Sequence, residues 1–472
     1  ETRKHFAMSG RQEELSADTA IDPYTIRPGD ERDAPPNFWG RFKHLGPSMI
    51  VTGSIVGSGE IILTAGLGAA AGFTLLWWVL LSCWSKSIVQ AEMARYVVLS
   101  GDTYLRAINR VPGRIRGPRG PVAWPIWLGL IGFIPGITGL GGILGGAGQA
   151  LALITPDIID GVGGTAIVAI LSAIILSIGA YRGLERMMLV LVISFTLTTL
   201  ICAIAMQFTE FGMTGEDLAA GFAFDFPMEY LVLALAVYGY TGVNSGETAA
   251  YTYWCVEKGY PSYIGANRED PAWEARARGW LKVLHTDVWV TLAILTCATL
   301  PFYVLGAGVL NALGVQPEGT ETISALSNMF TATLGEWAFW LFGFGAFFIL
   351  FSTVLSGIGA GGRVLPDYFA VLGFLDRLNL PGRIRFTRGY VVVIPIIGFL
   401  LYVAFQNPVT LIIVGAITAA VFAPIQSGAT IWLQKNHMDQ RMLPGMAARS
   451  LLWSVFIFQL GMAWLVLRYV VF

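Results

Sequence analysis

Long apolar runs separated by short polar loops make up most of this sequence from residue 46 onward. A helix needs about 20 mainly apolar residues to cross the hydrocarbon core of a bilayer. Suitable runs occur near residues 46–69, 74–99, 124–154, 162–180, 187–207, 230–254, 282–306, 335–360, 390–406, 409–433 and 447–471. The pattern predicts an all-α membrane protein with about eleven transmembrane helices. They fill residues 46–472, after a polar tail over residues 1–45.

Charged residues divide the loops between these runs into two classes. Lys and Arg occur in the tail and in the loops after the second, fourth, sixth, eighth and tenth runs. Neither occurs in the loops 70–73, 155–161, 208–229, 307–334 and 407–408. Loops rich in Lys and Arg face the cytoplasm. We therefore expect a multi-pass protein of the cell inner (plasma) membrane, with a cytoplasmic N-terminus and an external C-terminus. Within the basic loop 361–389, Tyr368 to Leu375 is apolar enough to predict a short amphipathic helix on the membrane surface.

Composition narrows the possible functions. Hydrophobic residues make up 55% of the chain and charged residues only 13%, against about 25% charged in a soluble domain. The net charge of −1 gives no indication of a nucleic-acid partner, and the four cysteines lack metal-ligand or redox spacing. An HExxH pair, a P-loop and a repeated filter sequence are all missing. We therefore expect a secondary transporter rather than an enzyme, an ATP-driven pump or a channel, and no cofactor.

Two of the apolar runs carry the same interruption. The pattern V-x-S-G-E occurs at 56–60 in the first run and at 243–247 in the sixth. Gly and small polar residues weaken a helix, and irregular backbone at membrane depth is tolerated only where it is buried or lines a cavity. Matching interruptions in two halves of a chain indicate an inverted-repeat transporter with its site at the interruptions. We expect one repeat over about 46–207, a second over about 230–433 and an extra helix at about 447–471.

Ionisable side chains accompany both interruptions. Glu60 and Glu247 each follow the Ser-Gly pair, and Lys86 lies in the second apolar run. An ionisable residue inside the membrane is by default a functional hypothesis. We expect Glu60, Glu247 and Lys86 to take part in proton coupling. Lys86 would pair with a carboxylate or line the inner vestibule, unless its side chain only snorkels to the cytoplasmic surface.

A longer match surrounds the first interruption. It comprises Gly46-Pro47, Gly59, Ala65-Gly66, Gly72-Phe73 and Leu75-Leu76-Trp77, and it continues without a gap through Ser82, Gln90, Arg95 and Gly101. This stretch resembles the opening of Nramp-type divalent-metal transporters. The resemblance implies a LeuT-like fold, in which five and five helices form inverted repeats, helices one and six are broken, and one helix is added.

The chain departs from that family at the positions that carry the family's chemistry. The family's Asp-Pro-Gly-Asn falls on residues 57–60, which here are Gly-Ser-Gly-Glu, and its Met-Pro-His falls nearest to 243–245, which here are Val-Asn-Ser. The family's acidic pair in the third helix falls on Gly142 and Gly145. The thioether ligand that favours transition metals is therefore missing. The comparison predicts that the metal site and the usual proton relay are both lost.

The remaining polar residues near the interruptions suggest a different substrate. The predicted substrate-binding residues are Ser54, Gly57, Ser58, Glu60, Gln149, Tyr240, Asn244, Ser245, Glu247 and Gln426. Hydroxyls, amides and carboxylates beside aromatic rings suit a small polar solute, because each solute hydroxyl both donates and accepts. A sugar such as glucose, carried with protons by a monomer, is the first interpretation. A hard cation also accepts oxygen ligands, so a transporter of Mg²⁺ or Mn²⁺ with altered selectivity stays open as the alternative.

Overall fold

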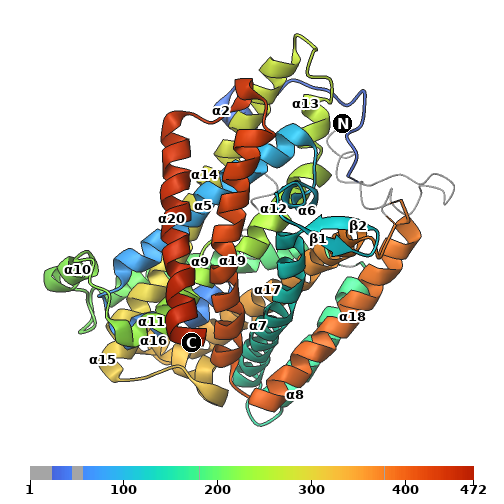
Figure 1. Ribbon diagram of the computed structural model, residues 1–472. Helices are drawn as coiled ribbons and strands as arrows, with labels where there is room; N and C mark the ends of the chain where they lie inside the picture. Colours follow the sequence, from blue (N-terminus) through green and yellow to red (C-terminus); the bar gives the residue numbers. More distant parts are fainter. Residues whose placement is uncertain (1–23, 45–56, 180, 377, 472) are drawn as a thin grey trace.

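The computed structural model describes residues 24–44, 57–179, 181–376 and 378–471, without the side chains of 181–189 and 471. Helices account for most of this part of the chain (Figure 1). In the first half they are α2 (Phe38–Phe42), α4 (Ala65–Ala71), α5 (Leu76–Ser100), α6 (Tyr104–Ile108), α7 (Trp124–Ile154), α8 (Gly161–Ser177), α9 (Tyr181–Met206) and α10 (Gly215–Gly221). In the second half they are α11 (Leu231–Tyr240), α12 (Ser245–Glu257), α13 (Tyr260–Ile264), α14 (Trp273–Leu305), α15 (Asn311–Leu313), α16 (Thr322–Leu334), α17 (Ala338–Leu372), α18 (Leu380–Phe405), α19 (Pro408–Asn436) and α20 (Met446–Val466).

The helices account for every predicted span. Within the described residues, six helical segments are long and apolar enough to cross a membrane: α7, α14 with its extension to Leu313, α17, α18, α19 and α20. The shorter apolar helices Gly59–Ala71, Gly161–Ser177 and Val190–Met206 match the first, fourth and fifth predicted spans. The second and sixth predicted spans correspond to α5 and to the pair α11 and α12. The all-α membrane class is therefore confirmed.

The loops gather at two ends of the bundle. We call the end that carries α2, α6, α13 and the Arg-rich loops the basic end, and the end that carries α10, α15 and α16 the acidic end. Figure 1 shows α2 and α13 toward the top and α15 and α16 toward the bottom. Two short strands at the basic end, β1 (Arg114–Gly117) and β2 (Gly120–Ala123), pair antiparallel, with Arg114 opposite Ala123. This hairpin forms part of the Arg-rich loop that follows the second predicted span.

The predicted surface helix at 368–375 is wrong. Residues up to Leu372 continue α17, and Gly373 ends the helix with a φ of +85°. Tyr368 is 8% exposed, and its ring lies 5.8 Å from that of Phe133 on α7. Because this aromatic ring packs inside the bundle, the segment extends the eighth spanning helix instead of lying on a membrane surface.

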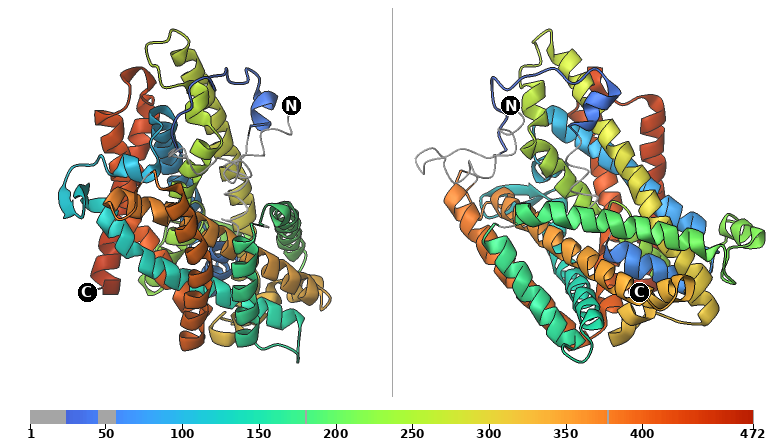
Figure 2. Two further views of the ribbon diagram at one scale, coloured as in Figure 1. Left: turned by 90° about the vertical axis from the view of Figure 1, so that its right-hand side faces the viewer. Right: turned by 180° about the vertical axis from the view of Figure 1, so that it is seen from behind.

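Small residues bring the backbones of neighbouring helices close together around α7. A Cβ atom on Gly148 would lie 2.3 Å from the amide nitrogen of Thr165 on α8, and one on Gly141 would lie 3.0 Å from the carbonyl oxygen of Gly398 on α18. Such contacts are typical of membrane helix interfaces, where van der Waals packing replaces the hydrophobic effect. The helices α8 and α18 pack against α7 and each other, along one side of the bundle (Figure 2).

The described part of the tail also contacts the helices. The N–H of Arg27 donates to Ser262 Oγ at 3.0 Å, and the N–H of Arg32 donates to the carbonyl of Tyr263 at 3.0 Å. The indole N–H of Trp280 on α14 donates to the carbonyl of Arg32 at 2.9 Å. Residues 27–32 therefore lie across α13 and the start of α14 at the basic end.

Candidate functional site

The second broken helix is interrupted between α11 and α12. Helix α11 ends at Tyr240 and helix α12 begins at Ser245, so residues 241–244 belong to neither helix. Gly242 has a φ of +72°, a conformation that glycine adopts without strain. A Cβ atom there would also lie 3.0 Å from the Cα atom of Cys83 on α5. The interruption lies where the V-x-S-G-E pattern predicts it.

The first broken helix is described from Gly57 onward, and Ser54 lies outside the described residues. Gly59–Thr64 form a π-helical turn that leads into α4, and such turns are frequent at functional sites. A Cβ atom on Gly59 would lie 2.8 Å from the carbonyl oxygen of Tyr240. The backbones of the two interruptions therefore touch, as expected for a pair of broken helices that face each other.

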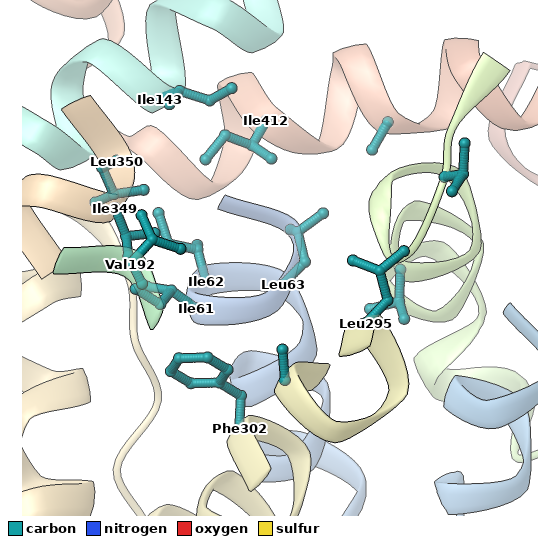
Figure 3. Close-up of a cluster of buried hydrophobic side chains, with 14 of the residues drawn as sticks. Ile61, Ile62, Leu63, Ile143, Val192, Leu295, Phe302, Ile349, Leu350 and Ile412 are labelled. Atoms are coloured by element: carbon teal, nitrogen blue, oxygen red, sulfur yellow. The ribbon is translucent and has the colours of Figure 1, made fainter. Parts of the chain in front are cut away.

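Apolar packing holds the π-helical turn in place. Ile61, Ile62 and Leu63 are at most 1% exposed. Figure 3 shows them among side chains contributed by other helices, including Val192, Ile349, Leu350, Ile412 and Phe302. The turn is therefore fixed by the core of the bundle, and Glu60, which belongs to the same turn, is fixed with it.

Glu60 joins the two interruptions through its carboxylate. Oε2 accepts a hydrogen bond from the N–H of Gly57 at 3.0 Å, and Oε1 accepts one from the N–H of Gly242 at 3.3 Å. The hydroxyl of Thr299 on α14 also donates to Oε1, at 3.5 Å. Glu60 is fully buried, where a carboxylate depends on such donors. The side chain therefore supports both interruptions.

A threonine pair lies beside Glu60. The hydroxyl oxygens of Thr64 and Thr241 are 2.8 Å apart, and Thr64 donates to the carbonyl of Gly59 at 2.9 Å. Neither threonine, nor Thr299, is among the residues predicted from the sequence. The one available signal was the position of Thr64 four residues after Glu60, on the same helical face.

Glu247 forms the first turn of α12 together with Asn244. Asn244 Oδ1 accepts from the N–H of Glu247 at 2.9 Å, and Glu247 Oε2 accepts from the N–H of Asn244 at 2.9 Å. This reciprocal capping box satisfies two backbone donors that the helix leaves free. Within the described residues, the second carboxylate oxygen, Oε1, accepts no hydrogen bond. Asn244, Ser245 and Glu247 are half-buried and Gly246 is exposed, so this helix start is accessible to solvent.

Lys86 reaches the second interruption from α5. Its ammonium donates to the carbonyl oxygens of Tyr238 and Thr241 and lies 5.0 Å from the centre of the Tyr238 ring. Within the described residues, no carboxylate lies within ion-pair distance of Lys86. The charges of Glu60 and Glu247 act on it from farther away. The predicted pairing with a carboxylate is therefore replaced by contacts with backbone carbonyls.

Gln426 reaches the same region from α19. Its side-chain N–H groups donate to the hydroxyl of Tyr104 at 3.2 Å and to the carbonyl of Ser245 at 3.3 Å. Within the described residues, Gln426 Oε1 accepts no hydrogen bond. The structure thus brings Glu60, Lys86, Asn244, Ser245, Glu247 and Gln426 to the interruptions, and we call these six residues the central cluster.

Two other predicted residues have different surroundings. Gln149, near the acidic end of α7, donates to the carbonyl of Gly319 at 3.0 Å and to the hydroxyl of Tyr402 at 3.2 Å. The hydroxyl of Tyr240 is wedged between α7 and α19, 2.4 Å from where a Cβ atom on Gly139 or Gly415 would lie. Gln149 therefore links α7 to Gly319 and to α18 at the acidic end. The side chain of Tyr240 packs between helices, and only its backbone lies at the interruptions. Ser58 is 3% exposed beside Gly57.

Neighbouring groups occupy the space beside three glycines that the Nramp comparison singles out. A Cβ atom on Gly57 would lie 2.2 Å from Thr353 Oγ1 on α17. One on Gly142 would lie 2.6 Å from the carbonyl oxygen of Pro408, and one on Gly145 would lie 2.1 Å from the Tyr402 ring. None of these positions has room for a larger side chain without movement of its neighbour.

A second polar cluster lies at the basic end. Asp367 on α17 is fully buried and accepts hydrogen bonds from Thr103, at 2.8 Å, and from the hydroxyl of Tyr253 on α12. Its other oxygen lies 3.4 Å from the Arg383 guanidinium on α18. The ring of Tyr24, from the tail, lies 5.3 Å from that of Tyr253. Four separate parts of the chain are therefore tied to α12 at this end.

The described part of the chain has no group of three or more His, Cys, Asp or Glu side chains placed to hold a metal ion. The central cluster instead offers carboxylate, amide and hydroxyl oxygens together with one ammonium. Such a set can coordinate a hydrated hard cation or hydrogen-bond a polar solute, and sulfur and imidazole ligands have no part in it.

Comparison with known proteins places this geometry in context. The family described as natural resistance-associated macrophage protein-like (Nramp) matches residues 48–469. An uncharacterized protein of Pasteurella multocida is 26% identical over 331 residues, which cover 68% of this chain and 70% of that protein.

Solved structures share the arrangement of helices. A manganese transporter of Eremococcus coleocola, in complex with an aromatic bis-isothiourea substituted compound, superposes with a TM-score of 0.66 at 15% identity and covers 96% of this chain and 90% of its own. MhsT in complex with L-phenylalanine superposes with a TM-score of 0.56 at 16% identity, over 92% and 99% of the two chains. At such identities the likeness concerns the fold alone.

Proposed function

The chain belongs to the Nramp family of transporters and has the LeuT-like fold, and from this premise we propose that it carries a divalent cation, Mg²⁺ or Mn²⁺, between its two broken helices. It is a multi-pass membrane transporter and not an enzyme. The family membership supports a cation as the substrate. The ordering of the two substrates suggested by the sequence is therefore reversed, with the cation first and the sugar second.

The free oxygen atoms of the central cluster carry this proposal. Glu247 Oε1 and Gln426 Oε1 accept no hydrogen bond within the described residues, and Gln426 contacts the carbonyl of Ser245 at the start of α12. Mg²⁺ usually keeps several of its waters and binds through only one or two carboxylates. Glu247 would be the direct or water-mediated ligand, with the Gln426 carbonyl beside it. Glu60, whose oxygens already accept three hydrogen bonds, would contribute charge.

The ligand set also supports altered selectivity. Thioether and imidazole groups favour late transition metals, and the central cluster contains neither. Thr353 occupies the space beside Gly57, where the family pattern has a ligating Asp. A partly hydrated hard cation suits these residues better than a dehydrated soft one.

A small polar solute such as glucose is the second candidate. It is favoured by the lack, within the described residues, of a group of three metal-ligating side chains. Amide, hydroxyl and carboxylate groups would hydrogen-bond its hydroxyls. The comparisons give this substrate no support, so it ranks below the cation.

Uptake into liposomes separates the two candidates. The purified chain would be reconstituted and tested with Mg²⁺, Mn²⁺ and labelled glucose in parallel. We expect saturable Mg²⁺ or Mn²⁺ uptake that falls at least tenfold in Glu247→Gln, whereas Lys282→Ala, an exposed change on α14, should leave it unaltered. Glucose uptake without cation uptake would overturn the proposal in favour of the second candidate.

We further propose that protons drive the transport. Glu60 or Glu247 would take up a proton on one side of the membrane and release it on the other. Lys86 interacts electrostatically with both carboxylates and would influence which of them carries the proton. If Glu60 is the carrier, Glu60→Gln should abolish uptake driven by a pH gradient while leaving exchange of labelled substrate intact. If Glu247 is the carrier, Glu247→Gln should weaken exchange as well, because Glu247 is also the proposed ligand. If uptake in both single variants keeps the wild-type dependence on external pH, neither carboxylate is the coupling site.

The orientation and organisation are part of the same proposal. We propose that the basic end faces the cytoplasm, that residues 46–207 and 230–433 form the two repeats, and that a monomer is sufficient. Glu216 and Glu318 are exposed at the acidic end. Cysteines introduced there should react with an impermeant thiol reagent on whole cells. Labelling only after lysis would reverse the orientation.

A further inference from the structure

The carbonyl end of α11 lacks the hydrogen bonds that a continuous helix would supply. In such a helix the N–H of Gly242 would donate to the carbonyl of Tyr238, four residues earlier. Here it donates to Glu60 Oε1 instead, and the last backbone bond of the helix runs from Thr241 to Val237 at 2.8 Å. The carbonyl oxygen of Tyr238 is released by this exchange.

Carbonyl oxygens at the end of α11 are suitable ligands for a cation. The C-terminus of a helix carries a partial negative charge. In transporters with broken helices, carbonyls at an unwound segment and at the end of a half-helix coordinate coupling ions. The carbonyl of Tyr238 lies at the end of the half-helix α11, and the carbonyl of Thr241 lies in the unwound segment. Each accepts a hydrogen bond from the Lys86 ammonium.

The surroundings of Lys86 are those of a bound cation and not of an ion pair. The side chain is 4% exposed. Its close partners are neutral carbonyls and the face of the Tyr238 ring, and within the described residues no carboxylate reaches ion-pair distance. A buried ammonium without a close counter-ion is costly, so the oxygens that surround it must compensate for its lost hydration.

The site is also held rigid around the ammonium. The hydroxyl of Tyr238 lies 3.2 Å from Ser85 Oγ on α5, and Gln459 on α20 donates to the same hydroxyl at 3.2 Å. Thr241 is fixed by its contact with Thr64. The two residues that carry these carbonyls are therefore fixed by contacts with three other helical segments, and none of these contacts involves Lys86.

From this geometry we infer that the ammonium of Lys86 fills a monovalent-cation site at the end of α11, as an ion tethered to the protein. The carbonyls of Tyr238 and Thr241 then need no free alkali cation, and the chain works without Na⁺ or K⁺ at this position. Removal of the ammonium would leave a vacant site with the chemistry for a small alkali cation, Na⁺ or Li⁺. The inference concerns an ion site and holds whichever substrate the transporter carries.

Thermal unfolding of the purified full-length chain tests this inference without any substrate. Melting temperatures would be measured in NaCl, LiCl and N-methyl-D-glucamine chloride at equal ionic strength, in buffer free of divalent cations. The wild type should melt at the same temperature in all three salts. Lys86→Ala should melt lower in N-methyl-D-glucamine and recover in Na⁺ or Li⁺, with a midpoint that saturates. Lys86→Arg keeps the charge and should show no cation dependence.

A control variant and a second neutral variant of Lys86 complete the experiment. Lys282→Ala removes an exposed lysine from α14 and should change neither the melting temperature nor its salt dependence. If Lys86→Ala cannot be purified folded, Lys86→Gln replaces it, extracted in Na⁺ throughout. A specific stabilisation of the wild type by Na⁺, a folded neutral variant indifferent to Na⁺ and Li⁺, or failure of both variants to fold even in Na⁺ would each overturn the inference.

Discussion

Gly57 on the first broken helix and Thr353 on α17 are in direct contact, because a Cβ atom on Gly57 would lie 2.2 Å from Thr353 Oγ1. The same Thr353 hydroxyl donates to the carbonyl of Ile349 at 2.9 Å. A side chain larger than glycine at position 57 would therefore collide with Thr353 unless one of the two residues moved.

Gly57→Asp should destabilise the protein, and Thr353→Ala should relieve the effect. Overpacking of a filled site costs about 1–3 kcal/mol, and residues in contact show coupling energies of about 0.5–3 kcal/mol. Thermal unfolding of both single variants and the double variant would measure the coupling. Additive losses in the double variant would contradict direct contact. Titration with Mn²⁺ would then report whether the double variant has gained a metal ligand.

Glu247→Gln should lose transport while keeping the fold. Glutamine also completes a capping box, so the start of α12 should stay formed. Loss of a charged ligand contact costs about 1.5–3 kcal/mol, which is about 10- to 100-fold in affinity for the proposed cation. Glu247→Ala should in addition lower stability by about 1 kcal/mol, the usual cost of a lost cap. Equal uptake by the wild type and Glu247→Gln would remove Glu247 from the site.

Gly145→Ala should be far more harmful than Gly136→Ala on the same helix. A Cβ atom at Gly145 would lie 2.1 Å from the buried ring of Tyr402, whereas one at Gly136 meets nothing within 4 Å. The first change should cost about 1–3 kcal/mol. The second should be neutral or stabilising by about 0.5–1 kcal/mol, because glycine is a poor helix former. Melting temperatures of the two variants test the contrast, and similar values would refute it.

Asp367→Asn should destabilise the basic end strongly. It would leave the buried Arg383 without its counter-ion, which typically costs about 3–5 kcal/mol. Glu257 and Arg363 offer a control, because they form an ion pair of 3.2 Å between side chains that are 36% and 43% exposed. Glu257→Gln should change stability by about 0–1 kcal/mol. Comparable losses in the two variants would argue against the Asp367 cluster as the group of contacts that stabilises this end.

Acidification should weaken the attachment of the tail through His44. Partial burial, followed by the charges of Lys258 and Arg32, lowers the pKa of His44 below its ordinary 6.5. As the pH falls through that value, the unfolded chain binds a proton before the folded chain does. Stability should therefore fall below about pH 6.5 and level off once the folded state is protonated too. His44→Gln should show a smaller drop in melting temperature between pH 7.5 and pH 5, and an unchanged drop would exclude this residue.

The sequence predicts the spanning helices and the second interruption well, because hydrophobic length and a Gly-Ser pattern are local properties. It predicts side-chain partners poorly. The sequence allows Lys86 to pair with a carboxylate, to line the inner vestibule or to snorkel to the surface. In the structure its partners are backbone carbonyls that are left without helical hydrogen bonds because α11 stops at Tyr240. Such acceptors have no signature in the residue types.

Gln149 illustrates a second limit. An amide in the third apolar run can belong to the centre or to either end of the membrane, since α7 runs for 31 residues and its depth depends on how it packs. The structure places Gln149 against Gly319 and Tyr402. The hairpin of β1 and β2 was missed for a related reason, because four-residue strands with mixed polarity carry little periodic signal.

The contacts of residues 27–32 with α13 and α14 also set an order of events during synthesis. Ser262, Tyr263 and Trp280, which hold this segment, are made more than two hundred residues after it. Until the ribosome has made these three residues, residues 27–32 lack the surface that holds them and are available to chaperones and proteases. Docking of residues 27–32 therefore requires that the chain has been made at least as far as Trp280. A protease that cuts the tail before Arg32 would therefore distinguish incomplete chains from finished ones.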